Sequence, residues 1–78
     1  MKKNNTLDEA VRVSLDKYFA DLGNAEPSDL YDMVLRCVER PLLEIALQRA
    51  DHNQSRAALM LGITRNTLHK KLLAHKLI

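Results

Sequence analysis

The chain has 78 residues and a formal net charge of +2, which is enough for one domain but not for a large core. Chains under roughly 80 residues gain little net stability from burial alone and usually add disulfides, a metal or a partner subunit. The single cysteine, Cys37, excludes an internal disulfide, and no Cys and His cluster has zinc spacing. We therefore expect no metal and no cofactor, and oligomerisation remains as the source of added stability.

The composition predicts an all-α fold. Apolar residues make up 46% of the chain and aromatic residues 4%, with only two Gly and two Pro available for turns. No segment alternates with the period of a strand. Because neither a signal peptide nor a long apolar run is present, we expect a cytoplasmic protein without a membrane span. The polar residues 1–5 are expected to form a flexible tail.

The first predicted helix begins at Thr6, which forms a capping box with Glu9. Gly23 can adopt the left-handed conformation that ends this helix. Between these positions, apolar residues recur at spacings of four and three, which places them on one face. The residues of this face are Leu7, Val11, Leu15, Tyr18 and Leu22.

The second predicted helix runs from about Asp29 to about Ala50, with Ser28 as its N-terminal cap. Pro41 predicts a kink or a break, and we favour a kink because the apolar pattern keeps its phase on both sides. Cys37 is expected to be a small buried apolar residue. One apolar face consists of Leu30, Val34, Val38, Leu42 and Ile45, and further apolar residues spread around it, namely Tyr31, Leu35, Leu43, Ala46 and Leu47.

A helix that is apolar on most sides must be buried on most sides. The chain is too short to cover this helix with its own residues, whereas a second copy can cover it through a two-fold interface. We therefore predict that residues 6–50 contain the dimerisation helices; the alternative is a four-helix core within one chain. The predicted dimer interface consists of Leu7, Val11, Leu15, Tyr18, Leu22, Leu30, Val34, Val38 and Leu42.

Residues 53–78 have the pattern of a helix, a glycine turn and a second, basic helix. The third helix is expected from about Gln54 to Leu61, capped by Asn53 or Asp51. Gly62 permits the positive φ of a tight turn. Such a short turn prevents an antiparallel arrangement, so the two helices should cross steeply as a helix-turn-helix.

The fourth helix is expected to be capped by Thr64 and to face the core with Leu68 and Leu72. Its other side, together with the start of the third helix, carries groups that suit DNA. Arg and Asn can bond guanine and adenine in the major groove, while Lys and free helix amides suit phosphates. The predicted DNA-binding residues are Asn53, Gln54, Ser55, Arg56, Thr64, Arg65, Asn66, Thr67, His69, Lys70 and Lys71.

The charge distribution agrees with a nucleic-acid partner. Residues 1–50 carry seven Lys and Arg against nine Asp and Glu, whereas residues 51–78 carry five against one. This asymmetry predicts a polyanionic partner for the C-terminal third; a solvated basic helix is the alternative. No paired carboxylates, Ser/His/Asp set or phosphate-binding glycine loop supports an enzyme or a small-molecule ligand. The alternative function is a small helical adaptor that binds an acidic protein or RNA.

At these residues the chain resembles the Fis family, the bacterial factor for inversion stimulation and similar nucleoid-associated regulators. The resemblance extends upstream to Tyr18-Phe19-Ala20-Asp21-Leu22 and to Val38-Glu39-Arg40-Pro41-Leu42-Leu43. The resemblance to the Fis family thus covers almost the whole chain. Sigma-54 enhancer-binding activators, by contrast, resemble only the C-terminal part of the chain. The resemblance implies a single domain over residues 1–78 and a homodimer whose first two helices intertwine. It further implies that the two recognition helices lie too close for straight B-DNA, so we expect the protein to bend A/T-centred, degenerate sites.

The resemblance also implies which residues contact DNA. Arg65 matches the residue that reads a guanine near each end of the site. Thr64 and His69 replace an Asn and an Arg of the best-known member, and Leu73 replaces a Lys, which predicts a shallower salt dependence. The residues before Leu7 are too few for the family's N-terminal arm, which activates DNA invertases, so we expect bending without stimulation of inversion. The matched contacts are Asn53, Gln54, Arg56, Arg65, Thr67, Lys70 and Lys71.

Overall fold

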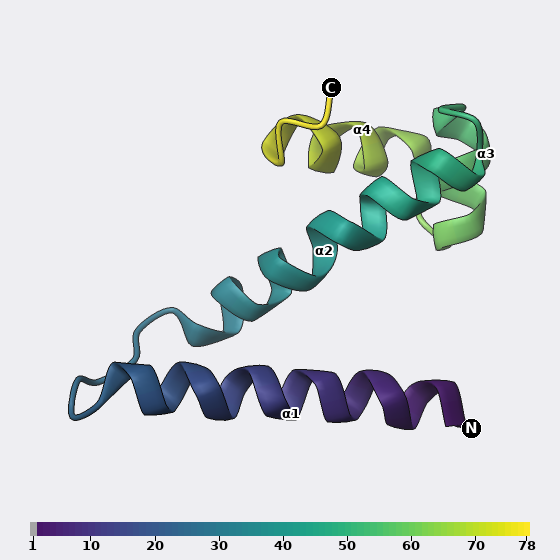
Figure 1. The fold of residues 1–78 in the computed structure, drawn as a ribbon. Coiled ribbons are helices and arrows are strands. Elements are labelled where there is room, and N and C mark those ends of the chain that lie inside the picture. Colours follow the sequence, from purple (N-terminus) through teal and green to yellow (C-terminus); the bar gives the residue numbers. More distant parts are fainter. Residues whose placement is uncertain (1) are drawn as a thin grey trace.

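The structure, a computed structural model, describes the backbone of residues 2–78 and the side chains of residues 6–78. It contains four helices: α1 (Lys2–Leu22), α2 (Leu30–Arg49), α3 (Gln54–Leu61) and α4 (Arg65–Ala74). The described residues contain no strand, so the predicted all-α fold class is confirmed. Figure 1 shows α1 and α2 as two long arms, with α3 and α4 packed at the far end of α2. None of these helices combines the length and apolarity that a membrane span requires.

The buried core lies where the C-terminal half of α2 meets α3 and α4. Leu68 and Leu72 are 0% exposed, which confirms that this side of α4 faces inward. Ala57 and Ala58 are also buried, because their small side chains let α3 pack closely against its neighbours. The core consists of Leu43, Ala46, Leu47, Ala50, Ala57, Ala58, Leu68 and Leu72, with Leu61, Ile63 and Leu77 at its edge.

Helices α2, α3 and α4 all end in a Schellman motif. In each, a backbone N–H donates to the carbonyl five residues earlier: His52 to Leu47 at 2.8 Å, Ile63 to Ala58 at 3.1 Å and Leu77 to Leu72 at 2.9 Å. Gly62 has φ 79°, as the sequence predicts for this turn. Asp51 and His52 reach φ 53° and 65° without glycine, because Asp and His tolerate the left-handed region better than most residues. This pair turns the chain from α2 into α3.

The predicted start of the first helix is wrong. Helix α1 extends back to Lys2, so Thr6 lies inside it and does not cap it with Glu9. The residues between Lys2 and Thr6 include no Pro or Gly that would stop the helix, and each added residue gains a backbone hydrogen bond. Of the predicted tail, Met1 lies outside the described residues and residues 2–5 continue α1. Its end agrees with the prediction, since Gly23 has φ 65°.

Helix α2 begins at Leu30, and Ser28 is not its cap as predicted. The N-cap is Asp29, which has φ 53° and makes no side-chain capping hydrogen bond. The first turn begins instead with the backbone bond from Met33 N–H to the Asp29 carbonyl at 2.9 Å. Pro41 lies inside α2 without ending it, so the predicted break does not occur and the kink remains a prediction.

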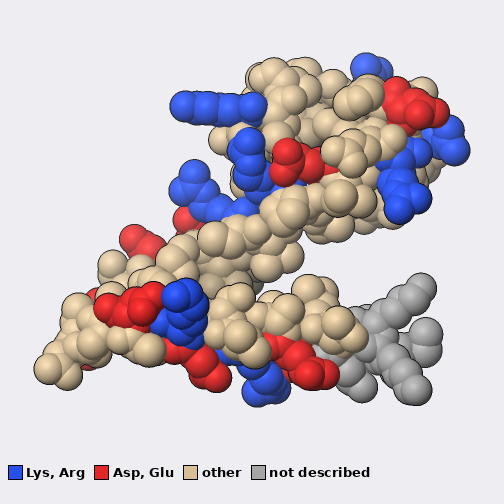
Figure 2. All heavy atoms as spheres, in the orientation of Figure 1, with Lys and Arg blue, Asp and Glu red and all other residues tan. Residues whose placement is uncertain are grey.

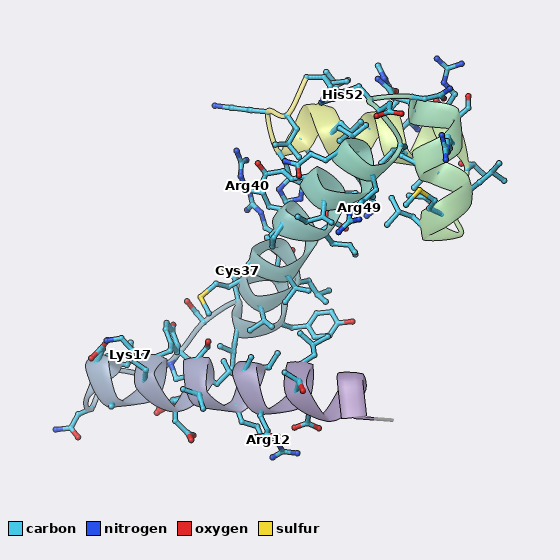
Figure 3. All side chains as sticks on the ribbon, turned by 45° about the vertical axis from the view of Figure 1, so that its right-hand side comes forward. Arg12, Lys17, Cys37, Arg40, Arg49 and His52 are labelled. Carbon is cyan, nitrogen blue, oxygen red and sulfur yellow. The ribbon has the colours of Figure 1, made fainter. Side chains whose placement is uncertain are left out.

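Helices α1 and α2 diverge from their connecting loop (Figure 1). Residues of both helices line an open, apolar cleft of about 400 Å³. Cys37 lines this cleft and is exposed, so the prediction that it is buried is wrong for the single chain. Figure 3 shows its sulfur projecting from the side of α2. Within residues 6–22 of α1 no side chain is buried. The structure therefore does not show the alternative arrangement, a four-helix core within one chain.

Candidate nucleic-acid interface

Side-chain caps fix the start of both helices of the helix-turn-helix. Asn53 Oδ1 accepts a hydrogen bond from the Arg56 N–H at 3.1 Å, and Thr64 Oγ1 accepts from the Thr67 N–H at 3.1 Å. The cap of α3 is thus Asn53 and not Asp51, and the predicted cap of α4 is confirmed. Because Asn53 uses its oxygen for the cap, its amino group stays available as a donor. The Thr64 hydroxyl also lies 2.9 Å from the Thr67 hydroxyl, so it is committed to the turn.

The predicted DNA-binding residues lie over the start of α3 and the outer side of α4, and nine of the eleven are exposed. Arg65, Asn66 and His69 line one open hollow of about 410 Å³. His69 Nδ1 lies 3.1 Å from Gln54 Oε1, so a ring N–H donates to the amide oxygen and joins α4 to the start of α3. Gln54 is half-buried. The structure therefore joins the start of α3 to this hollow on α4 and directs Lys71 to α2 instead.

This surface is cationic. Residues 53–78 contain no Asp or Glu, and within the described side chains Arg56, Arg65 and Lys70 form no ion pair. Most described cations of the two long helices instead face acids one turn away, as in the pairs Arg12 with Asp8, Lys17 with Asp21 and Arg36 with Asp32. Figure 2 shows red and blue mixed along α1, and at the α3–α4 end it shows blue groups that project outward together with some red groups. The unpaired cations are thus concentrated on the helix-turn-helix.

Lys71 points toward α2 instead. Its Nζ donates to Glu39 Oε2 at 2.7 Å, and His75 Nε2–H donates to Glu39 Oε1 at 2.8 Å. The hydrogen bonds from Lys71 and from His75 lower the pKa of the Glu39 carboxyl, although burial acts in the opposite direction. A guanidinium nitrogen of Arg40, the next residue of α2, donates to the His75 carbonyl. Figure 3 shows the Arg40 side chain extending from α2.

Glu39 and His75 were not among the residues that the sequence pattern indicated. Lys71 and His75 lie four residues apart on α4, so they present two donors on one side of the helix. That spacing is a signal for a shared anionic partner. The partner itself lies 32 residues before Lys71, and only the packing of α4 against α2 identifies it.

Residues 34–75 match the model of the family described as bacterial regulatory protein, Fis family. The chain is 53% identical over 74 residues to a Fis-like DNA-binding protein of Ralstonia nicotianae, with 95% of this chain and 96% of that protein covered. It is 47% identical over 72 residues to a Fis-like DNA-binding protein of Neisseria meningitidis serogroup A, covering 92% and 91%. It is 52% identical over 66 residues to the DNA-binding protein Fis of Yersinia pestis, covering 85% and 67%. The chain therefore belongs to the Fis family of bacterial regulatory proteins.

Proposed function

We propose that this chain is a homodimeric, sequence-tolerant protein that binds and bends double-stranded DNA, a nucleoid-associated transcriptional regulator of the cytoplasm. The observation that carries the proposal is the group of exposed cations without ion pairs, Arg56, Arg65 and Lys70, across one helix-turn-helix. The relatives that are named as DNA-binding proteins support it. Residues 6–50 would serve dimerisation and residues 53–78 would bind DNA, within a single domain.

Arg65 is the proposed base reader, because it is the first residue of α4 and lines the exposed hollow with Asn66 and His69. A guanidinium can donate two hydrogen bonds to O6 and N7 of guanine in the major groove. Phosphate contacts fall to Lys70 and Arg56, since a charged flexible side chain positions the protein without reading sequence. The Asn53 amino group and the first backbone amides of α3 add neutral donors to the same phosphates.

The dimer is proposed from the apolar surface that the single chain leaves open. None of the nine predicted interface residues is buried, and Leu7 and Leu42 are 59% and 52% exposed. Burying a side chain of this size contributes roughly 1.5–3 kcal/mol, so a second copy that covers them stabilises the chain substantially. A two-fold axis then holds two α4 helices at one spacing. Where that spacing is shorter than a turn of straight DNA, the duplex must bend, and sites with deformable centres bind best.

Duplex binding tests the proposal directly. We expect the wild-type chain to shift short A/T-centred duplexes that carry a guanine near each end, and to bind G/C-centred duplexes more weakly. Arg65→Ala should lose the discrimination at the end guanines, which is worth roughly 1–3 kcal/mol for a bidentate pair. Arg12→Ala on α1 is the control, because Arg12 pairs with Asp8 away from α4. Stronger binding to RNA or to an acidic protein than to any duplex would contradict the proposal.

The oligomeric state is tested separately. We expect sedimentation equilibrium to give a dimer for the wild-type chain and a monomer for Val38→Glu, because a carboxylate in a dry interface loses its hydration. Val13→Glu is the control, since Val13 is 68% exposed and lies on the side of α1 opposite Val11 and Leu15. A wild-type monomer that still binds and bends DNA would refute the dimer.

A further inference from the structure

We propose that Glu39 is a positioning residue, which holds Lys71 and His75 and so sets the orientation of α4 on α2. In this role Lys71 is part of the clamp and is not a phosphate ligand. The inference rests on the proposed DNA-binding function and adds to it the group that orients the recognition helix. The Glu39 clamp is defined here as Glu39, Arg40, Lys71 and His75.

The geometry of the Glu39 clamp is that of a shared carboxylate. Each oxygen of Glu39 accepts one hydrogen bond, at 2.7 Å from Lys71 and at 2.8 Å from His75. Both donors come from the last part of α4, while both α2 residues are adjacent in the chain. The side chain of His75 is only 10% exposed and that of Glu39 31% exposed, so water competes weakly for the inner contact. A carboxylate held by two donors cannot rotate without losing one of them.

Arg40 fixes the same end of α4 in a second way. Its guanidinium donates to the His75 carbonyl, which belongs to the C-cap residue of α4. Carbonyls at a helix C-terminus lack partners within the helix and carry the negative end of its dipole, so a cation there is favourable. The core contacts of Leu68 and Leu72 hold α4 near its middle, and the Glu39 clamp holds its end. Together these contacts determine how the DNA-facing side of α4 is turned.

The direction of Lys71 on α4 differs from that of Lys70. With roughly 100° between successive residues, Lys70 lies roughly opposite the midpoint of Leu68 and Leu72, and Lys71 lies roughly 80° from that midpoint. Lys70 is exposed, whereas Lys71 is half-buried against Glu39. Two neighbouring lysines therefore have different roles: Lys70 meets phosphate, and Lys71 joins α4 to α2.

The salt dependence of duplex binding distinguishes these roles. In Lys70→Met, a lost phosphate contact should lower the slope of log affinity against log salt by ~0.9 per chain. Lys71→Met should keep the wild-type slope and change the bend angle, measured by fluorescence transfer between the duplex ends. Glu39→Gln should change the bend in the same way. Its control is Asp32→Asn, which removes the same charge from α2 where the carboxylate pairs with Arg36, at 3.9 Å, outside the clamp. A slope lowered equally in both lysine variants, or a wild-type bend in Glu39→Gln, would overturn the assignment.

If no duplex binds, the proposed function is refuted but the clamp is not. A stability measurement without DNA then tests the clamp on its own. Glu39→Gln, Lys71→Met and the double variant are unfolded in urea at one chain concentration. If the two side chains act through each other, the double variant should lose no more stability than the larger single loss. Additive losses in the double variant would overturn the clamp. A shared loss supports it whatever the DNA result.

Discussion

The variant Leu73→Lys tests most directly whether the outer side of α4 lies beside DNA phosphates. Leu73 is 53% exposed and lies roughly 120° around α4 from the midpoint of Leu68 and Leu72. It thus projects on the side of Lys70. A lysine at this position adds one cation to each recognition helix without removing a core contact, so the folded structure should be unchanged.

The expected change in the salt dependence of duplex binding follows from counterion release. Each new phosphate contact steepens the slope of log affinity against log salt by ~0.9, so two chains in a dimer add ~1.8. Over a fourfold rise in salt, from about 50 to about 200 mM, the affinity of Leu73→Lys should fall ~12 times further than that of the wild type. The assay is a fluorescence anisotropy titration of one labelled duplex at several salt concentrations.

The control is Val13→Lys, which adds the same charge to α1 at a position that is 68% exposed and far along the chain from the helix-turn-helix. Its slope should stay close to that of the wild type. Equal slopes for the wild type and Leu73→Lys would refute the placement of Leu73 beside phosphates. An equal increase in both lysine variants would show that net charge, and not position, sets the salt dependence.

Further predictions concern stability, measured by urea unfolding at a fixed chain concentration because a dimer's stability depends on it. Leu68→Ala should lower the free energy of unfolding by roughly 2–5 kcal/mol, because a leucine that is 0% exposed leaves a cavity. Leu59→Ala should change stability little, because Leu59 is 82% exposed. Equal losses of stability in the two variants would contradict the placement of the core. Thr64→Ala should lower the free energy of unfolding by ~1 kcal/mol because the cap is lost. Thr64→Ser keeps a capping hydroxyl and should therefore keep most of the wild-type stability. Equal losses of stability in the Ala and Ser variants would show that the cap is not the cause. The pKa of Glu39 is lowered in the folded chain, so its contribution to stability is complete above the pKa of the unfolded carboxyl and is lost as pH falls through the lower folded pKa. The stability difference between wild type and Glu39→Gln should therefore shrink across the acid range, and a constant difference would refute the ionised clamp.

Local features of the chain follow from its sequence alone. The caps at Asn53 and Thr64 and the left-handed turn at Gly62 agree with prediction, because each depends on atoms three or four residues apart. The inward side of α4, with Leu68 and Leu72, agrees for the same reason, since the helical period determines which residues share a side. Most of the proposed DNA surface is therefore encoded by neighbours along the chain.

Features that involve alternatives of similar local energy were less predictable. Thr6 satisfies the pattern of a capping box, yet α1 continues through it to Lys2, because a cap pattern does not stop a helix whose preceding residues also favour one. Ser28 is a good cap by type, yet Asp29 takes the position with φ 53°. The left-handed turn at Asp51 and His52 contains no glycine that would predict it from the sequence. In each case several residues fit locally, and the path of the whole chain selects one.

The placement of the helices relative to one another depends on tertiary contacts. Cys37 is predicted to be buried from its residue type, yet it lies in an open cleft because α1 and α2 diverge within one chain. Lys71 has the sequence of a phosphate contact, yet its Nζ meets Glu39 on α2. The four-helix pattern and the exposed reading side of the helix-turn-helix are already present in the order of the residues, since both depend on near neighbours. The partner of Lys71 depends on a contact across 32 residues, which no local period encodes.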